Sequence, residues 1–434
     1  MKRIILLALS LMASAAYAQN SRIFSISTGP GEDASCQMGI SWATDTTLTG
    51  SYVLLSRKGE DESIKVLPQQ QERWTAFDGV WSDRPDKEEF HEDAVFTKCG
   101  TMLTGLQPDT DYQYVIKTDT GEQSSIHYFK TAGASEWSCC IISDFHSYTP
   151  LPGRLEASMG MIGKVQEYDP SVSWVFSPGD VVAWGGSYSF WRRLFEENAF
   201  ERMMWARVNG NHDNWTKESQ VTHDFDIPND YFLGTSYFPR NGYDPEMGVC
   251  YHFRYGNTLF VMLNTEDMHK EGELEAAKDW LRSVVTLARK SPEPPMFVVV
   301  CEHYEWFYGT DGRDSEHKYW AETFDELGID LAVSGNNHVY VRTHPLYGNV
   351  RDDENGTVYI VTPSSDDDRG REISKERFAN QDKIANRWSE GAHSVGAVHM
   401  AVDEAAITLT LLDRHGNELD RCTIKANSHN TLLP

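Results

Sequence analysis

Several apolar segments of the chain end in aspartate, asparagine or histidine, which are side chains that can bind metal ions. A single such residue after an apolar segment is usually a cap or part of a turn. Here the pattern recurs at five segments, and buried carboxylates are costly to gather unless a cation neutralises them. The sequence therefore predicts a metal site. Its candidate donors are Asp144 and His146 in "SDFH", Asp180 in "PGD", Asn211 in "GNHD", His303 in "CEH", and Asn336 and His338 in "GNNH".

The segments that must position these donors alternate between apolar strands and helix-like stretches. "CCIISDFH" precedes "RLEASMGMIGKVQEY", "SWVFSPGD" precedes "SFWRRLFEENAFERM", and "MFVVVCEH" follows "LEAAKDWLRSVVTLARK". This order predicts a layered domain over residues 136–434, with central strands that are buried on both faces. In open α/β sheets, ligands bind outside the carboxyl ends of the strands, and the candidate donors fall at those ends.

The residues before this domain, 20–132, have a different pattern. Segments such as "CQMGISWAT" and "GSYVLLSRK" alternate apolar and polar residues, with turn signals between them. This alternation predicts a β-sandwich. Because the region contains no cluster of potential catalytic residues, we expect a supporting domain. A module that binds a carbohydrate or a protein partner is the alternative.

The first 18 residues have the composition of a secretory signal peptide. Lys2 and Arg3 precede an apolar run, which ends in the small residues around Ala16 and Ala18. The run is too short to span a bilayer. We predict cleavage after Ala18 and an exported protein, periplasmic or secreted, without a membrane anchor.

The seven cysteines leave at least one thiol unpaired if disulfides form. An exported protein can form disulfides, but most of these cysteines lie in apolar runs, where a buried free thiol is the commoner state. Cys36 and Cys99 are the best candidates for a bridge, because both fall in the sandwich.

The composition narrows the class of partner. The chain of 434 residues carries a formal net charge of -26, with 40% hydrophobic and 24% charged residues. A surface that binds DNA or RNA needs clustered lysine and arginine, so no nucleic-acid partner is expected. The charge fits a soluble protein that collects cations in an acidic cleft, whereas the oligomeric state does not follow from the sequence.

The order of the strand-end motifs resembles that of the calcineurin-like metallophosphoesterases: D-x-H, G-D, G-N-H-D, H and finally G-x-x-H. "LTGLQPDTDYQYVIKT" in the sandwich is similar to fibronectin type III domains. With "YHFRYGNTLFVMLNTED" and "GTVYIVTPSSDD", it resembles the purple acid phosphatase branch. The resemblance implies an α+β protein, in which the N-terminal β-sandwich is followed by a four-layer αββα sandwich that holds two metal ions.

The resemblance also implies a role for each donor. One ion would be held by Asp144, His146 and His338, the second by Asn211 and His303, and Asp180 would bridge both. His212 would be catalytic and contact the phosphoryl oxygen or the leaving group, oriented by Asp213. Two ions can clamp phosphoryl oxygens and lower the pKa of a shared water, which makes hydroxide available near neutral pH. The ions would be divalent or trivalent, such as Fe, Mn or Zn.

Two positions depart from the family pattern. Purple acid phosphatases have a metal-ligating tyrosine three residues after the G-D aspartate, where this chain has Ala183, and Tyr188 is out of register. We therefore expect no phenolate-to-iron colour. The last motif usually has a histidine where this chain has Asn336, and an amide is a weaker donor to transition metals. Either the second site is weaker or prefers harder ions, or another histidine fills the position, such as His269 or His344.

Aromatic and basic residues near the motifs are candidates for substrate binding. They could stack on a base, a sugar or a phenyl group, or grip a phosphate oxygen; ordinary packing and surface charge are the alternatives. The candidates are Trp184, Trp215, Tyr304 and Arg342, with Arg369 and Arg371 from "DDDRGRE" as further possibilities.

These features predict an exported hydrolase of phosphate monoesters that uses a binuclear metal site. Two alternatives remain open at this stage. The first is a phosphodiesterase or nucleotidase of the same fold. The second is a pseudoenzyme that binds a phosphorylated ligand or a glycan, which the asparagine at position 336 keeps open.

Overall fold

The structure is a computed structural model that describes residues 22–77, 93–215, 226–243, 248–264, 266, 272–307, 316–373 and 382–427. The predicted signal peptide and His269 lie outside these ranges. Within the described residues, no helix is both long enough and apolar enough to cross a membrane.

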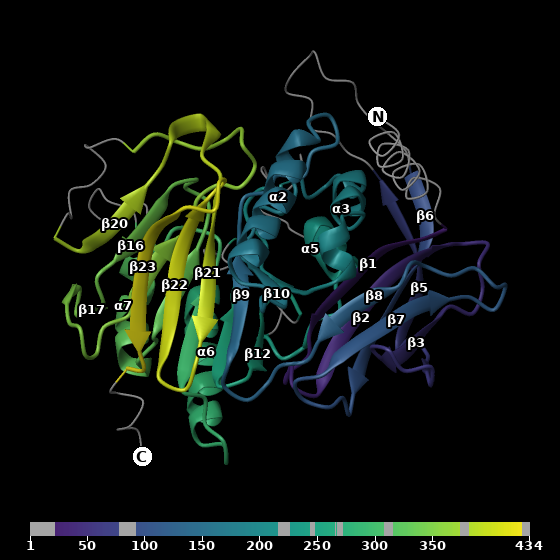
Figure 1. Ribbon diagram of the computed structural model, residues 1–434, viewed down its shortest axis with the longest axis horizontal. Coiled ribbons are helices and arrows are strands. Elements are labelled where there is room, and N and C mark those ends of the chain that lie inside the picture. Colours follow the sequence, from purple (N-terminus) through teal and green to yellow (C-terminus); the bar gives the residue numbers. More distant parts are fainter. Residues whose placement is uncertain are drawn as a thin grey trace.

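The N-terminal domain is a β-sandwich of two four-stranded sheets, drawn in purple and blue in Figure 1. Strands alternate inward and outward side chains; in β7, for example, Tyr112, Tyr114 and Ile116 are buried and the residues between them are more exposed. One sheet has the order β1-β2-β6-β5, formed by β1 (Ile23–Pro30), β2 (Gln37–Asp45), β5 (Gln70–Phe77) and β6 (Asp93–Thr104). The other has the order β4-β3-β7-β8, formed by β3 (Tyr52–Arg57), β4 (Ile64–Val66), β7 (Asp111–Lys117) and β8 (His127–Lys130).

The C-terminal domain contains two further sheets. The six-stranded sheet has the order β11-β10-β9-β21-β22-β23: β9 (Trp137–Ile141), β10 (Trp174–Ser177), β11 (Met204–Arg207), β21 (Gly396–Val402), β22 (Ala406–Asp413) and β23 (Glu418–Lys425). The seven-stranded sheet has the order β12-β13-β14-β15-β19-β16-β20: β12 (Tyr251–Tyr255), β13 (Thr258–Met262), β14 (Phe297–Cys301), β15 (Leu331–Ser334), β16 (Tyr340–Thr343), β19 (Val358–Val361) and β20 (Ile384–Trp388). A short hairpin joins β17 (Leu346–Tyr347) and β18 (Val350–Arg351).

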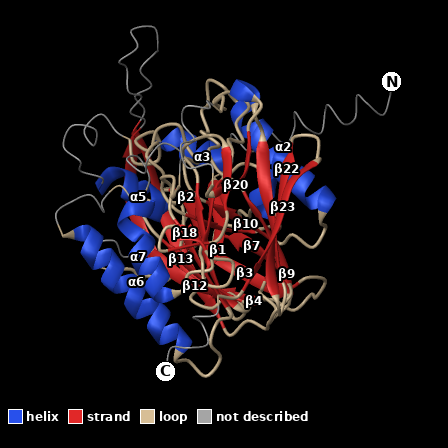
Figure 2. Cartoon of the chain, turned by 90° about the vertical axis from the view of Figure 1, so that its left-hand side faces the viewer, coloured by secondary structure: helices blue, strands red, loops and turns tan. Residues whose placement is uncertain are grey.

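Helices cover the outer faces of the two sheets, and this gives the predicted four-layer αββα arrangement. Helix α2 (Gly153–Tyr168) packs on β21, whereas α6 (Glu273–Arg289) packs on β13 and on α7 (His317–Leu327). Figure 2 shows α6 and α7 together on one outer side of the molecule, with α2 on the other. The apolar face of α6 contains Ala277, Leu281 and Val284, at helical spacing. The central strands β14 and β15 are buried along their whole length because both of their faces are covered.

Shorter helices lie between the sandwich and the C-terminal domain. Aromatic rings from the two domains pack against one another there. These helices are α3 (Tyr188–Leu194), η1 (Asn198–Glu201) and α5 (Asp226–Gly234), while η4 (Gly391–His393) precedes β21. Phe96 of β6 stacks on Tyr188 of α3, with ring centroids 4.7 Å apart. Tyr188 is therefore part of the domain junction. At Gly39 of β2, a Cβ atom would lie only 1.8 Å from the carbonyl oxygen of Tyr237, so the close approach of the domains requires glycine at this position.

The expected bridge between Cys36 and Cys99 does not form, since all seven cysteines are free. The strand register explains why. Cys99 in β6 lies opposite Trp42 of β2, whereas Cys36 precedes the first residue of β2, Gln37. Even Gln37 is five strand residues from Trp42, or about 17 Å at roughly 3.4 Å per residue, so Cys36 lies too far from Cys99 for a disulfide.

Candidate metal centre

The candidate donors lie in loops that follow five strands, at one edge of the two facing sheets. Asp144 and His146 follow β9, Asp180 follows β10, Asn211 follows β11, His303 follows β14, and Asn336 and His338 follow β15. Because β9, β10 and β11 run parallel to one another, as do β14 and β15, their carboxyl ends meet at a common edge.

The backbone at this edge adopts an unusual conformation. Left-handed φ angles, between 45° and 66°, occur at Asp144, His146, Asp180, Asn336 and His338. Non-glycine residues rarely adopt this region, and their clustering is typical of functional sites. The neighbouring chain must also approach closely: a Cβ atom on Gly210 would lie 2.2 Å from Oδ1 of Asp180. The glycine of "GNHD" therefore leaves room for the Asp180 carboxylate.

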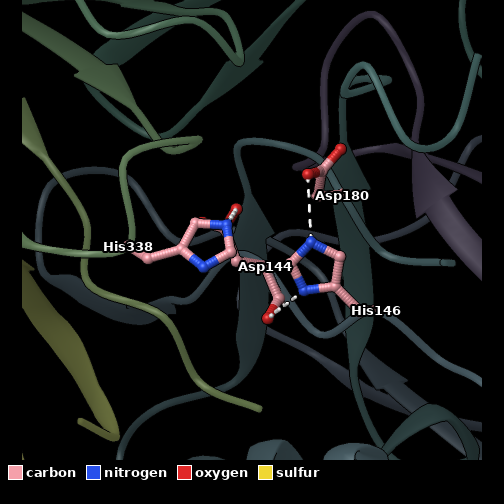
Figure 3. A group of neighbouring side chains, drawn as sticks. All are labelled: Asp144, His146, Asp180 and His338. Atoms are coloured by element: carbon pink, nitrogen blue, oxygen red, sulfur yellow. Dashed lines mark hydrogen bonds and ion pairs between the residues drawn. The ribbon is translucent and has the colours of Figure 1, made fainter. Parts of the chain in front are cut away.

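Four of the predicted donors form one buried group. Asp144, His146, Asp180 and His338 each offer a ligand atom, and these atoms all lie within 4.8 Å of one another (Figure 3). Nε2 of His146 is 3.2 Å from Oδ2 of Asp180, and Nε2 of His338 is 3.3 Å from Oδ1 of Asp144. Oδ1 of Asp144 is buried and has no hydrogen-bond partner among the described residues. A buried carboxylate oxygen of this kind is what a metal ion would satisfy.

Three of the imidazole rings are held through their Nδ1 atoms, which leaves Nε2 available to a metal ion. Nδ1 of His146 lies 2.9 Å from Oδ2 of Asp366, and Nδ1 of His338 donates to the carbonyl oxygen of Arg369 at 2.7 Å. Nδ1 of His303 donates in the same way to the carbonyl oxygen of Pro178, also at 2.7 Å. Such partners fix the tautomer and the orientation of metal-binding histidines.

Asp366 is an important residue that the strand-end motifs did not identify. It follows β19, at the same sheet edge as the donors, and its Oδ1 accepts hydrogen bonds from Ser364 Oγ and from the amides of Asp368 and Arg369. The signal that could have found it is an acidic residue in the loop that follows an apolar strand, although here it comes five residues after the end of β19, in "VYIVTPSSD".

A second donor group surrounds the other oxygen of Asp180. Oδ1 of Asp180 lies 3.3 Å from Nε2 of His303, and this nitrogen is also 3.0 Å from Oδ1 of Asn211. Asn336 approaches from the last motif, but its Nδ2 donates to Oε2 of Glu305 at 2.7 Å. The sequence argument did not single out Glu305, which lies two residues after His303 in a loop and has no motif of its own.

His344 does not replace the missing histidine. Its amide donates to the carbonyl oxygen of Lys383, and the charged groups that act on its ring are Arg351, Arg342 and Asp353, near the β17–β18 hairpin. The alternative in which His344 binds the second ion in place of the missing histidine is therefore wrong. The other candidate, His269, lies outside the described residues.

The acidic and basic groups of the cluster shift one another's pKa values. Burial opposes the ionised form of Asp180, but the charges of His303 and His212 and hydrogen bonds from His146 and His303 hold its pKa well below the usual range. Burial likewise lowers the pKa of His303, yet the Asp180 carboxylate raises it to about 10. Burial raises the pKa of Asp144 to about 6. A proton on His303 thus neutralises Asp180, a role that a metal cation can take.

His212 lies beside the donor group, and its orientation differs from the prediction. Its Nδ1 donates to the carbonyl oxygen of Ala183 at 2.9 Å. The carboxylate of Asp213 instead accepts hydrogen bonds from the amides of Val182 and Gly210, at 2.9 and 2.8 Å. Asp213 therefore fixes the two loops that carry Asp180 and His212, and not the His212 ring itself. Burial lowers the pKa of His212 to about 3, so its ring is neutral near pH 7.

The predicted substrate-binding residues fall into two groups. Trp215 lies against the His212 ring with centroids 4.0 Å apart, and Trp184 lies 5.5 Å from Trp215. Both indoles are thus beside the catalytic candidate. The hydroxyl of Tyr304 donates to Glu266, and the Arg342 guanidinium forms two hydrogen bonds, of 2.6 and 3.0 Å, to Asp420 on β23. Arg342 is committed to this ion pair, which contradicts its predicted role in binding phosphate.

Comparison with known proteins agrees with this geometry. Residues 139–340 match the calcineurin-like phosphoesterase family, and residues 24–131 match the N-terminal domain of purple acid phosphatases. Two uncharacterized proteins of Mycobacterium tuberculosis, from strains CDC 1551 / Oshkosh and ATCC 25618 / H37Rv, are each 24% identical over 363 residues, which is 77% of this chain. The chain spans 64% of the length of these relatives.

Two solved structures share the fold at low identity. The purple acid phosphatase PPD1 from yellow lupin seeds has a TM-score of 0.72 at 17% identity, covering 95% of this chain and 76% of the lupin chain. PhoD has a TM-score of 0.62 at 12% identity and covers 94% of both chains. The fold agrees with that of these two structures, and the buried donor group lies within the residues that match the phosphoesterase family. The chain thus contains a calcineurin-like phosphoesterase domain over residues 139–340, and a purple acid phosphatase N-terminal domain over residues 24–131 precedes it.

Proposed function

We propose that this chain hydrolyses phosphate monoesters with the help of two metal ions bridged by Asp180. The observation that carries the proposal is the position of this carboxylate between two donor groups. Its Oδ2 faces Nε2 of His146 at 3.2 Å, and its Oδ1 faces Nε2 of His303 at 3.3 Å. Asp144 and His338 would complete one ion site, and Asn211 would contribute to the other. Two bound ions would draw electron density from the phosphoryl group and lower the pKa of a water molecule between them.

In this proposal, His212 would assist the leaving group. Its Nδ1–H is used by the carbonyl oxygen of Ala183, so Nε2 is the atom left for the substrate. Near pH 7 the isolated ring is neutral, but a phosphoryl anion beside Nε2 favours the protonated form, because opposite charges stabilise each other. The ring could then donate a proton to the leaving oxygen. Trp215 and Trp184 would form an apolar wall beside this oxygen and would suit an aromatic or otherwise flat leaving group.

Arg369 would hold the phosphoryl group. Its backbone is fixed at both ends, since the amide donates to Asp366 and the carbonyl accepts from His338. The charge of its half-buried side chain acts on Asp144, Asp180 and Asp366. No ion pair or hydrogen bond of its guanidinium occurs within the described part of the chain. The Arg369 guanidinium would therefore be free to donate hydrogen bonds to a phosphate oxygen.

The test combines metal analysis with a pair of esters. The purified protein is loaded separately with Mn²⁺, Zn²⁺ and iron, its metal content is measured, and turnover of 4-nitrophenyl phosphate is compared with that of the bis-ester. We expect about two ions per chain and faster turnover of the monoester. Faster turnover of the bis-ester would favour the phosphodiesterase alternative. A fully loaded protein that hydrolyses neither ester would contradict the proposal and favour a ligand-binding pseudoenzyme.

Two further expectations belong to this proposal. The protein would be exported after cleavage between Ala18 and Gln19, and a mature protein that retains residues 1–18 in mass analysis would contradict this. The iron-loaded protein would lack a phenolate charge-transfer band, because Ala183 replaces the ligating tyrosine. A strong visible band that bleaches on reduction would mean that another tyrosine reaches the metal.

A further inference from the structure

Glu305 is a nearly buried carboxylate in direct contact with the position at which this chain departs from its family. Only 6% of its surface is exposed, and its Oε2 accepts a 2.7 Å hydrogen bond from Nδ2 of Asn336. It also interacts electrostatically with His303, a candidate donor to the second ion. A buried carboxylate here is costly unless neighbouring groups or a cation stabilise it.

The hydrogen bond to Glu305 determines which atom of the Asn336 amide is available to a metal ion. An amide group has a donating nitrogen and an accepting oxygen on the same carbon, whereas a carboxylate oxygen accepts. Because Glu305 takes the nitrogen, Oδ1 of Asn336 is left without a role in this contact. The left-handed backbone at Asn336, with φ of 66°, holds the side chain in this loop conformation.

We propose that Glu305 is a positioning residue that turns the Asn336 amide so that its oxygen is a ligand of the second metal ion. The donors of that ion would then be oxygens of Asp180, Asn211 and Asn336 with a single imidazole, His303. Oxygen-rich donor sets favour Mn²⁺ and Mg²⁺, whereas additional imidazole favours Zn²⁺. The pair of Glu305 and Asn336 would thus set the metal preference of the second site. The proposal rests on the two-ion site proposed above, but it does not require hydrolysis.

The test measures metal binding without substrate. Metal-free protein is titrated calorimetrically with Mn²⁺ and with Zn²⁺, and Mn²⁺ occupancy is followed by electron paramagnetic resonance. In Glu305→Ala, we expect the affinity of the second Mn²⁺ to fall about 10- to 100-fold, as is typical when the partner of a metal ligand is removed. The first ion should bind as in the wild type. Glu305→Gln retains an accepting oxygen and should recover most of the affinity.

Glu302→Gln is the matched control. Glu302 is also a buried glutamate of the same segment, but its carboxyl oxygens have no hydrogen-bond partner within the described residues. This variant should bind both ions normally. Thermal unfolding of each metal-free variant separates a loss of affinity from a loss of folding.

The outcomes distinguish this inference from the proposed function. If Glu305→Ala binds the second Mn²⁺ as tightly as the wild type does, or if it weakens both ions equally, the positioning role is overturned. If the second ion is weakened selectively and Glu305→Gln restores it, the role is supported. That support would hold even for a protein that hydrolyses neither ester, which would overturn only the proposed function.

Discussion

The two halves of the metal centre share Asp180 but differ in how the remaining donors are built. In the first half, the imidazoles of His146 and His338 converge on Asp144, and each ring is fixed from behind, by Asp366 or by a backbone carbonyl. In the second half, one fixed imidazole, His303, meets amide side chains. The first half is therefore suited to a tightly held ion, and the second to a harder and more exchangeable one.

The difference suggests how the expected family pattern can be kept in one half of a candidate metal centre and changed in the other. Asn336 retains the left-handed backbone of the last motif but exchanges an imidazole for an amide. The amide that replaces it donates a hydrogen bond to Glu305. The four experiments below test whether the two halves behave differently, in order of decreasing expected effect.

The largest effect is expected for Asp180→Ala, which removes the group common to both halves. Metal content should fall for both ions, and turnover should decrease by at least on the order of a thousandfold, since the ions would carry the chemistry. Elemental analysis and turnover of a phosphate monoester measure the two effects. Asp169→Ala is the control, because it breaks another Asp–His pair, 2.7 Å between Asp169 Oδ2 and His399 Nε2, away from the centre. Equal losses in both variants would contradict the bridging role.

His212→Ala should have the next largest effect and should leave both halves intact. Loss of a proton donor typically lowers turnover by about 10²- to 10⁴-fold. Because the Nδ1 atom of His212 is bonded to Ala183 and the ring does not belong to the four-residue donor group, metal content should not change. Elemental analysis measures the metal content, and steady-state kinetics measures the turnover. A variant that loses an ion would show that His212 is itself a ligand.

Chelator titration compares the metal affinities of the two halves directly. We expect the wild type to release its ions in two steps, the second-half ion first, because that half has fewer imidazole donors. Asn336→His should tighten the weaker step by about 10- to 100-fold for Zn²⁺ and bring the two steps together. Metal stoichiometry against chelator concentration is the measurement. A single tight release of two ions in the wild type, unaltered by Asn336→His, would mean that the halves are equivalent.

The smallest effect is expected for Arg369→Ala, which tests a residue next to the first half. Loss of one charge-assisted hydrogen bond to phosphate should weaken substrate binding by about 1.5 kcal/mol and so raise KM by roughly 10-fold. The metal content should stay constant. Arg342→Ala is the matched control, since Arg342 is paired with Asp420. It should lower the melting temperature without raising KM. A KM increase in Arg342→Ala alone would reverse the two assignments.

The positions of the metal donors could be predicted because their strands are so uniformly apolar. Strands such as β14, "FVVVC", and β15, "LAVS", are buried on both faces, so the polar residue after each one marks the sheet edge. Residues that act through distant partners could not be found in this way. The partner of Arg342 is 78 residues away, and that of Glu305 is 31 residues away. The absent Cys36–Cys99 bridge depended on the register of β2 and β6, which composition does not determine.

The left-handed residues at the sheet edge would make the free energy of unfolding depend on metal binding. Each such residue costs on the order of 1–3 kcal/mol, and less for asparagine and aspartate, while the carboxylates beside them repel one another. Bound cations offset both costs, and an ion present at about 100 times its Kd adds roughly 2.7 kcal/mol to the free energy of unfolding. The free energy of unfolding would therefore rise with the concentration of free metal around the protein. Under the proposed function, a molecule that loses its more exchangeable ion would lose activity and stability together.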